Sequence, residues 1–378
     1  MKLRWITWWP APYWIDRFNH LAAQSGIDLE VCFLSAGSSL QEWNIEKERW
    51  QFNYRVIKNQ SRTSGYFRPQ WEVPNPMPLI SGNFDLTIMP YADVSCLAAA
   101  AMLSCVQRPY ILFVANTIWD DRNTNTVKEM LKKIIFRRAA AIFATGPAQQ
   151  KYAMQYGVDT NKTYEIGNPS VAYSDHYPVE QDMKDELKRV HGFGGEIVIL
   201  YVGRLSEEKG LLTLLDAVAN VKGKMNSSLR IVLAGAGHQA SVLQKFSEAR
   251  GLQVTFTGFL QKDELATYYL MADIFVLPSQ SEPWGLVVNE AMHFALPVIV
   301  SDRVGAVPSL LEDEKNGLVF QSGNVDHLAR CLEKLVIDSD LRVRMGGAAR
   351  QGISSHSIER WGASVLDGCS DVLARKNK

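Results

Sequence analysis

Residues 277–292 have the sequence LPSQSEPWGLVVNEAM, and the fold prediction starts from this stretch. The apolar run Asp273 to Leu277 is typical of a buried strand, and the residues from Gly285 onward have the apolar spacing of a helix. A strand that leads through a loop into a helix N-terminus creates a place for an anion. The first helical turn leaves backbone N–H groups without acceptors, and the helix dipole favours negative charge there. We therefore expect phosphate binding at this loop.

Two glutamates, Glu282 and Glu290, bracket this predicted anion site with seven residues between them. In one continuous helix they would lie roughly 12 Å apart along the axis, at about 1.5 Å per residue. The paired carboxylates of retaining glycosidases lie about 5 Å apart, so we do not expect these two to flank one scissile bond. The spacing instead favours contacts with separate parts of one extended, phosphate-centred ligand, and a sugar nucleotide has that layout.

The run EPWGLVVNE, followed by AMHFALPVIVSDRVGAVPSLLEDEKNGLVF, resembles the donor-binding core of the family-4 retaining glycosyltransferases of the GT-B fold. The resemblance implies an α/β protein with two Rossmann-like, doubly wound parallel-sheet domains and an interdomain cleft. It also implies that Glu282 holds sugar hydroxyls and that Glu290 holds the ribose. The donor-binding residues that it implies in this run are Pro283, Trp284, Gly285, Leu286, Val287 and Glu290.

Residues 203–210, GRLSEEKG, follow another strand-like run and match the G-R-L-x-x-x-K-G signature of the same family. Gly203 permits a close approach of the backbone to a ligand. Arg204 offers a planar fork for phosphate oxygens, and Lys209 offers a point charge. The resemblance implies that both cations neutralise the diphosphate leaving group. Arg204, Lys209 and Glu282 are therefore the predicted catalytic residues.

The glycine-rich turn from Gly235 through Gly237 to Ala240 fits the dinucleotide fingerprint G-x-G-x-x-A. That fingerprint needs an acidic residue about 20 positions further on, and residues 255–260 there are TFTGFL. An NAD-dependent oxidoreductase is therefore one alternative function, and a GT-B protein that binds a sugar nucleotide without turnover is another. The resemblance implies instead that Gly235 and Gly237 line the donor site and that Phe259 meets the nucleotide base.

The first half of the chain departs from the family's pattern at two places. Residues 10–13 are PAPY where relatives often have a glycine pair, and Asn116 stands where many have histidine. We predict Pro10, Ala11 and Asn116 on the acceptor side. The pair Asp120-Asp121 lacks further ligands, so a turn or a helix cap explains it better than a metal site. We predict no metal and no cofactor other than the nucleotide diphosphate sugar that serves as the donor.

Residues 127–138 are predicted to form a helix that carries cations beside apolar residues. These residues are Lys128, Lys132, Lys133, Arg137 and Arg138, with Met130, Leu131, Ile134, Ile135 and Phe136. We favour a buried face with a solvated basic edge. The alternative is contact with an anionic membrane that presents a lipid-linked acceptor.

The 378 residues suit two domains rather than one. We predict an acceptor-binding Rossmann-like domain over 1–170 and a nucleotide-sugar-binding one over 171–356. By resemblance, a C-terminal helix over 357–378 returns to the first domain. Strands alternating with helices predict parallel sheets in both halves. Residues 40–80 are expected to hold loops and short elements, and 168–195 to form a polar interdomain connection.

Charge and cysteine usage limit the partners and the compartment. Lys+Arg and Asp+Glu both total 40, so no overall basic field is available for nucleic acid. The five cysteines lack C-x-x-C spacing, which favours a reducing, cytoplasmic setting. No secretory signal is evident, and the longest apolar stretch, 96–106, is too short to span a membrane. The predicted activity is retaining, metal-independent transfer from a UDP-, GDP- or dTDP-linked sugar. The acceptor is predicted to be a glycan, a lipid-linked molecule or a small molecule, with a peripheral membrane contact left open.

Overall fold

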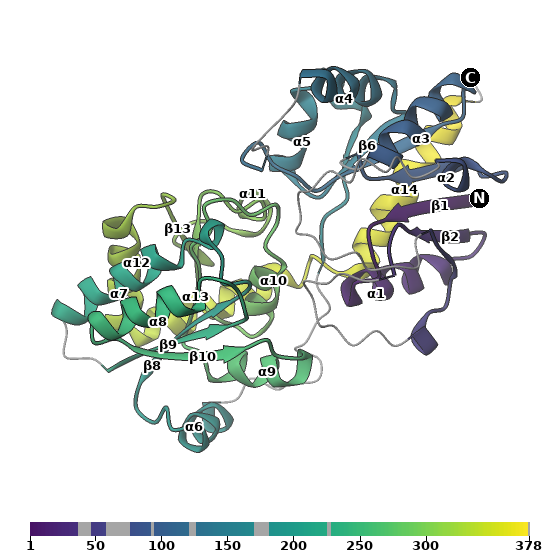
Figure 1. The fold of residues 1–378 in the computed structure, drawn as a ribbon. Helices are drawn as coiled ribbons and strands as arrows, with labels where there is room; N and C mark the ends of the chain where they lie inside the picture. The colour runs from purple at the N-terminus through teal and green to yellow at the C-terminus, as the bar shows by residue number, and fades with distance from the viewer. Residues whose placement is uncertain are drawn as a thin grey trace. The chain divides into compact units, whose positions relative to one another are not determined.

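The computed structural model describes residues 1–36, 47–57, 76–91, 94–120, 126–169, 181–224 and 228–376. The chain forms two compact units (Figure 1). Unit 1 consists of Met1–Asn168 and Ile358–Lys378, and unit 2 consists of Pro169–Ser357. Each unit is built on one parallel sheet with helices packed against it, so the predicted α/β class with two parallel-sheet domains is confirmed.

Unit 1 contains a seven-stranded sheet in the order β3-β2-β1-β4-β5-β6-β7. Its strands are β1 Lys2–Thr7, β2 Asp28–Phe33, β3 Asn53–Val56, β4 Leu86–Met89, β5 Tyr110–Val114, β6 Ala141–Ala144 and β7 Thr163–Glu165. Its helices are α1 Pro12–Ala22, α2 Met77–Ile80, α3 Val94–Cys105, α4 Thr126–Arg138, α5 Pro147–Met154 and α14 Ile358–Lys376. The described strand pairings are all parallel, and β1, an interior strand, pairs with both β2 and β4.

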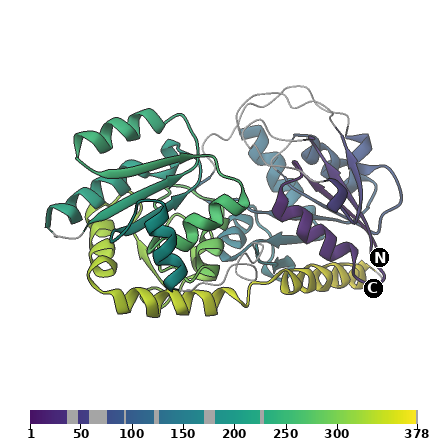
Figure 2. The ribbon, with the colours of Figure 1, turned by 90° about the horizontal axis from the view of Figure 1, so that it is seen from below.

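Aromatic side chains dominate the core on one face of this sheet. Trp5 of β1 is fully buried and lies within 6 Å, between ring centroids, of Trp14 and Phe18 on α1 and of Trp361 on α14. Helix α14 packs along α1 (Figure 2). The two helices come so close that a Cβ on Gly362 would lie 2.6 Å from the His20 ring. Segments from the two ends of the described chain therefore share one core.

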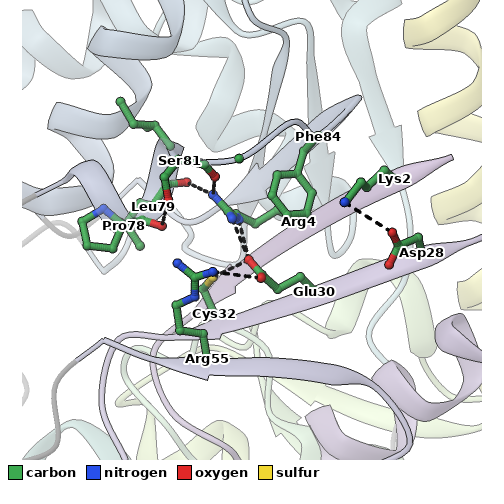
Figure 3. A network of polar contacts seen from close by, with 12 residues as sticks. Lys2, Arg4, Asp28, Glu30, Cys32, Arg55, Pro78, Leu79, Ser81 and Phe84 are labelled. Carbon is green, nitrogen blue, oxygen red and sulfur yellow. Dashed lines mark hydrogen bonds and ion pairs between the residues drawn. The ribbon is translucent and has the colours of Figure 1, made fainter.

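Arg4 lies in strand β1 and is buried, and burying an unpaired charge would cost free energy of folding. Its guanidinium donates to Oε1 of Glu30 at 2.6 Å and to the carbonyls of Leu79 and Ser81 at 2.9 and 2.6 Å (Figure 3). It also lies 3.9 Å from the centroid of the Phe84 ring. These contacts pair the charge and tie helix α2 and the loop after it to strands β1 and β2.

Unit 2 contains a six-stranded sheet in the order β10-β9-β8-β11-β12-β13. Its strands are β8 Ile197–Val202, β9 Leu229–Ala234, β10 Gln253–Gly258, β11 Ile274–Leu277, β12 Val298–Ser301 and β13 Gly317–Phe320. Its helices are α6 Gln181–Val190, α7 Leu211–Lys224, α8 Ala240–Ala249, α9 Lys262–Met271, α10 Leu286–His293, α11 Val307–Leu310, α12 Val325–Ile337 and α13 Ser339–Ile353. β8, β11 and β12 are nearly continuous buried apolar runs, as expected for parallel strands covered on both faces, whereas the edge strand β10 contains polar residues and is only partly buried.

One expectation about the connection between the halves is wrong. Residues 181–190, predicted as part of a polar connection, form helix α6. Two of its lysines hold it to the sheet, because Lys184 and Lys188 make ion pairs with Asp273 at 2.7 and 2.5 Å. Leu187 packs against the core of unit 2. Residues 170–180 of the predicted connection lie outside the described residues.

Two strands escaped the sequence analysis. β3 lies within the stretch 40–80, where only loops and short elements were expected, and it forms an edge of its sheet. β13 forms an edge of the other sheet and begins at Gly317, after a charged turn. Both are short, four-residue strands, and so short a run carries little periodicity.

Candidate active site

A pocket of about 140 Å³ lies at the carboxyl ends of β8 and β11, which are neighbours in the unit 2 sheet. Its walls come from the end of β8, the loop after it, the end of β11 and the first turn of α10. The lining residues are Tyr201, Val202, Gly203, Arg204, Lys209, Leu277, Glu282, Gly285, Leu286 and Val287. Seven of the predicted site residues are thus brought together within one unit.

Lys209 and Glu282 form the most closely paired charges in this pocket. Nζ of Lys209 lies 2.5 Å from Oε2 of Glu282, and both side chains are more than four-fifths buried. Gly210 makes this geometry possible, because it has φ of 66° and a Cβ there would lie 2.2 Å from the carbonyl oxygen of Pro278. The loop after β8 can therefore reach the end of β11, and the ion pair fixes the lysine ammonium at the pocket wall.

Arg204 is the more accessible cation of the pocket. Its side chain is 43% exposed and makes an ion pair with Glu208 at 3.1 Å. Its carbonyl oxygen accepts a hydrogen bond from the Tyr201 hydroxyl at 2.7 Å. Burial raises the pKa of Tyr201 well above its ordinary value, and the nearby Glu282 carboxylate raises it further, so the phenol stays a neutral donor. The Arg204 side chain is therefore partly accessible to solvent, and the hydrogen bond from Tyr201 holds its backbone.

Tyr201 is a pocket residue that the sequence analysis missed. It lies two positions before Gly203, and alternate residues of a strand point to the same side of a sheet. A Cβ on Gly203 would lie 2.7 Å from the Tyr201 hydroxyl oxygen. Gly203, which begins the G-R-L-x-x-x-K-G run, therefore leaves room for the Tyr201 side chain. The spacing of two residues between Tyr201 and Gly203 is the sequence feature that could have predicted Tyr201 as a pocket residue.

Helix α10 begins at Leu286, directly after Gly285 in the left-handed conformation at φ 93°. A Cβ on Gly285 would also lie 3.0 Å from the Leu277 side chain. Leu286 and Val287 belong to the first turn, whose amides have no intrahelical acceptors, and both line the pocket. The predicted combination of a strand, a glycine loop and a helix N-terminus is present.

Two further residues of the E-x₇-E run lie elsewhere. Trp284 is 4% exposed and belongs to the core of unit 2, where its indole N–H donates to Oδ1 of Asn289 at 3.0 Å. Pro283 is half-buried and is not among the described residues that line the pocket. The indole therefore supports the loop from inside.

Glu290 lies one turn inside α10, outside the set of described residues that line the pocket. Its Oε2 accepts a hydrogen bond from the Tyr269 hydroxyl of α9 at 2.8 Å. Burial raises the pKa of Glu290 to about 7, against the opposing effects of the Tyr269 hydrogen bond and the Lys262 charge. Tyr269 was not predicted, because nothing in the local spacing of α9 distinguishes it from a core residue.

The glycine-rich turn after β9 has a structural explanation. A Cβ on Gly235 would lie 1.9 Å from the carbonyl oxygen of Gly203, and one on Gly237 would lie 2.2 Å from that of Leu205. Both glycines therefore allow this turn to pack against the loop after β8. Phe259, which follows β10, is about one-third exposed. His238, in the same turn, makes an exposed contact with Glu207 at 2.6 Å.

The predicted acceptor-side residues lie at the carboxyl edge of the unit 1 sheet. Pro10 and Ala11 follow β1, and both are buried; Ala11 precedes the first residue of α1. Asn116 is half-buried after β5, which is separated from β1 by β4. Oδ2 of Asp120 accepts from the backbone N–H of Thr117 at 2.6 Å, so this aspartate stabilises a turn.

The described part of the chain shows neither a cluster of metal ligands nor a membrane-spanning helix. Within it, no group of three or more His, Cys, Asp or Glu residues is arranged to hold a metal ion. Asp121, the second aspartate of the pair considered above, lies outside that part. Among the helices described, none combines the length and apolar character that crossing a bilayer requires.

Comparison with known proteins places this geometry in a family. Residues 183–352, which include the entire pocket, match the family model "Glycosyl transferases group 1". Over this region the chain is similar to the group 1 glycosyltransferases. The matched region spans α6 through nearly all of α13, which is most of unit 2.

Two relatives illustrate how far the similarity extends. Sulfoquinovosyl transferase SQD2 of Arabidopsis thaliana is 31% identical over 230 residues, which cover 60% of this chain and 44% of the relative. A GDP-mannose-dependent alpha-(1-6)-phosphatidylinositol monomannoside mannosyltransferase of Mycobacterium tuberculosis is 28% identical over 229 residues, covering 58% and 55%. The chain therefore spans about half the length of these curated relatives.

Solved structures extend the likeness to both units. Anabaena Alr3699/HepE in complex with UDP and glucose has a TM-score of 0.78 at 18% identity, covering 98% of this chain and 100% of that one. A sucrose-phosphate synthase from Thermosynechococcus elongatus has a TM-score of 0.75 at 17% identity, covering 99% of each chain. At such identities the likeness concerns the fold. The chain thus has the GT-B fold.

Proposed function

We propose that the protein is a glycosyltransferase that moves a sugar from a nucleotide diphosphate sugar to an acceptor with retention of configuration and without a metal. The pocket in unit 2 carries this proposal. It combines two cations, Arg204 and Lys209, with the first-turn amides of α10 and the carboxylate of Glu282. A diphosphate needs the cations and amides, whereas sugar hydroxyls need a carboxylate acceptor.

In this mechanism the leaving diphosphate gains negative charge in the transition state. Arg204, whose guanidinium is partly exposed, meets this charge together with Lys209. Preorganised donors at such a position stabilise the transition state more than the bound donor, and that difference accelerates the reaction. Glu282 accepts hydrogen bonds from sugar hydroxyls while it holds Lys209 in place. Glu290 binds the ribose hydroxyls from its position deeper in α10.

Retention follows if the acceptor attacks on the face that the leaving phosphate vacates. A phosphate oxygen then takes the acceptor's proton, the new glycosidic bond forms, and the bond from the anomeric carbon to the phosphate oxygen breaks. We do not expect Glu282 and Glu290 to act as a nucleophile and acid pair, because Glu290 is not among the described residues that line the pocket and its carboxylate accepts a hydrogen bond from Tyr269. Arg204 and Lys209 supply positive charge that a divalent cation would otherwise provide.

The test is product NMR of the new anomeric linkage, with and without a chelator. UDP-, GDP- and dTDP-linked sugars should first be screened as donors by thermal shift, because ligand binding stabilises the folded state by mass action. Transfer with retention that survives the chelator supports the proposal. An inverted anomer, or activity that requires added metal, overturns the mechanism.

Two alternative functions can be distinguished from glycosyl transfer with the same purified protein. An NAD-dependent oxidoreductase would bind dinucleotide at the glycine-rich turn, but Gly235 and Gly237 are already required for contacts with the loop after β8. A non-catalytic protein would bind nucleotide sugars without turnover. Calorimetric titration with NAD addresses the first alternative, and donor hydrolysis or transfer assays address the second.

The relatives suggest classes of donor and acceptor for a role in polysaccharide or glycoconjugate synthesis. The mannosyltransferase is GDP-mannose-dependent and its name specifies a phosphatidylinositol monomannoside, whereas the Anabaena structure holds UDP and glucose. We therefore include lipid-linked, glycan and small-molecule acceptors in the proposal. The five cysteines are all free thiols, which favours a cytoplasmic setting.

A peripheral membrane contact through α4 is the proposed way of reaching a lipid-linked acceptor. Val127, Met130, Leu131 and Ile134 are all exposed and share one helical face at spacings of three and four residues. Exposed cations flank that face, namely Lys128, Lys133, Arg137 and Arg138. Apolar side chains with flanking cations are complementary to an anionic bilayer surface.

Lys132, which we had grouped with these cations, is buried and does not belong to the exposed face. Its Nζ donates to the hydroxyls of Tyr152 and Tyr156 at 3.2 and 3.3 Å and lies 3.0 Å from Glu129. The membrane test therefore uses Lys133→Glu/Arg137→Glu. Co-sedimentation with phosphatidylglycerol vesicles should fall in this variant and with salt. Sedimentation equal to that with neutral vesicles would contradict the contact.

A further inference from the structure

Unit 1 contains a second and larger pocket, of about 600 Å³. Pro109, Ala140 and Lys162 line it, and they immediately precede strands β5, β6 and β7. Because these strands are parallel neighbours, the pocket lies at the amino edge of the sheet. Pro10, Ala11 and Asn116 lie at the opposite, carboxyl edge. The pocket is therefore separate from the residues assigned above to donor and acceptor binding, although it shares Arg138 with the exposed cations of α4.

The described wall of this pocket carries cations and no carboxylate. Its cations are Arg108, Arg138, Lys162, Arg375 and Lys376, and the other lining residues are Ser104, Gln107, Pro109, Tyr110, Ala140 and Val372. Five positive charges around one cavity contrast with the zero net charge of the chain. Mutual repulsion makes such a cluster unfavourable unless an anion joins it.

The charges of these side chains are not neutralised within the described residues. Arg108 donates only to the carbonyls of residues 80, 82 and 84, and Arg375 donates to the Asn161 carbonyl and the Tyr164 hydroxyl. These acceptors are neutral groups. The nearby Asp371 accepts a hydrogen bond from Tyr164 at 3.2 Å and is not part of the pocket wall. These hydrogen bonds hold Arg108 and Arg375 in place without pairing them with a carboxylate.

We infer that this pocket binds a phosphate-bearing ligand with an organic portion. Guanidinium forks match phosphate oxygens in geometry, and lysines add point charges. The volume lies in the range of small-molecule sites, roughly 300–1,000 Å³, so a phosphate alone would leave most of it empty. Pro109, Ala140 and Val372 supply apolar wall for the rest of the ligand. The phosphate can belong to a soluble organic phosphate or to a phospholipid headgroup.

The test uses the full chain and two probes, inorganic pyrophosphate and vesicles that contain phosphatidic acid. The pocket variant is Lys162→Gln/Lys376→Gln, because neither lysine makes a contact that folding needs in the described structure and neither lies on α4. The matched control is Lys151→Gln/Lys245→Gln, which removes two exposed charges from α5 and α8. Arg204→Ala serves as the reciprocal control, because pyrophosphate also suits the unit 2 pocket.

Calorimetric affinity for pyrophosphate should fall about tenfold in the pocket variant, as expected when charge-assisted bonds are lost. The matched control should change less than twofold, and UDP affinity should be unchanged in both. Binding of phosphatidic acid vesicles alone, lost in the pocket variant and kept in the control, identifies a lipid headgroup as the source. Equal behaviour of the two variants with both probes would overturn the inference. The inference does not rest on the proposed transferase activity, which Arg204→Ala tests separately.

Discussion

The carboxyl edges of the two sheets differ in chemistry although their architecture is alike. In unit 2 the loop after β8 contributes Arg204 and Lys209 to a pocket, and glycines allow three loops to meet there. In unit 1 the loop after β1 consists of buried Pro10 and Ala11, which lead into α1. One edge thus presents fixed charges, and the other presents packed backbone and the amide of Asn116. In the proposed function, the phosphate-bearing donor uses the first edge and the hydroxyl acceptor uses the second.

The sharpest test of this contrast is Arg204→Ala. Removing one preorganised donor to a developing anion costs about 10²–10³ in kcat, whereas the ground-state donor loses only part of its binding energy. We expect steady-state assays to show kcat reduced on the order of 100-fold and calorimetric donor affinity reduced by less than about tenfold. The control is Arg250→Ala, which breaks the surface ion pair with Asp216. Equal losses of kcat and affinity would assign Arg204 to uniform binding.

Glu290→Gln should have the next largest effect. The change keeps the shape of the side chain and removes a charged acceptor for the ribose hydroxyls, so the free nucleotide diphosphate should bind roughly 1.5–3 kcal/mol more weakly. Calorimetry with UDP and GDP measures this loss. Glu264→Gln, in the first turn of α9, is the control for a neighbouring carboxylate. Unchanged nucleotide affinity in Glu290→Gln would remove the ribose assignment.

Gly237→Ala tests whether the glycine-rich turn of unit 2 is structural. The new Cβ would lie 2.2 Å from the Leu205 carbonyl oxygen, so the loops must separate, and overpacking of this kind costs about 1–3 kcal/mol. The urea midpoint, followed by circular dichroism, should fall. Gly347→Ala on α13 is the matched control, because nothing lies within 4 Å of its Cβ position. A similar urea midpoint for both variants would show that the turn accommodates a Cβ at position 237 and that the glycine is not required for packing.

The affinity for nucleotide should also depend on pH through Glu290. Its pKa is about 7 in the free protein because of burial, so below that pH the carboxyl is protonated and is a poorer acceptor for ribose hydroxyls. Affinity should rise from pH 6 to pH 8 by about tenfold, the change in the ionised fraction across a pKa near 7. The phosphate of the ligand titrates too, so the informative quantity is the difference from Glu290→Gln. Identical pH profiles for the two proteins would contradict this role.

The smallest effect is expected on the neutral edge, in unit 1. Asn116→Ala should leave nucleotide affinity unchanged and lower the transfer rate only about two- to tenfold, the range for one neutral hydrogen bond. Asn116→Asp is the control variant, because it keeps the size of the side chain and an oxygen that can accept a hydrogen bond. A loss of more than about 100-fold in Asn116→Ala would exceed one such bond and would place decisive chemistry on this edge as well.

The sequence predicted unit 2 more closely than unit 1 for physical reasons. The strand before Gly203 and the helix after Gly285 were both predicted and are both present, because their apolar residues mark them in the sequence. The Arg204, Lys209 and Glu282 cluster was predictable because its residues lie in recognisable runs at strand ends. Tyr201 and Tyr269 were not, because their importance depends on contacts across elements rather than on local spacing.

Burial of charge was the main feature that sequence alone left hidden. Lys132 resembles its neighbours on α4 in charge and spacing, yet it is the one that turns inward to two tyrosines from α5 and the residues after it. Lys184 and Lys188 likewise belong to a helix that we predicted as part of a connection. Their role depends on ion pairs with Asp273, which lies in another segment of the chain. Long-range pairing of this kind has no local sequence signature.

The composition of unit 1 from two separate segments has a consequence for synthesis on the ribosome. Translation proceeds from the N-terminus, so Trp5, Trp14 and Phe18 emerge long before Trp361, which completes their cluster. During that interval all of unit 2 is made and is free to fold. The aromatic surface of the first segment therefore stays exposed while more than 180 further residues are synthesised. Exposed apolar surfaces of this kind are prone to aggregation and are bound by chaperones.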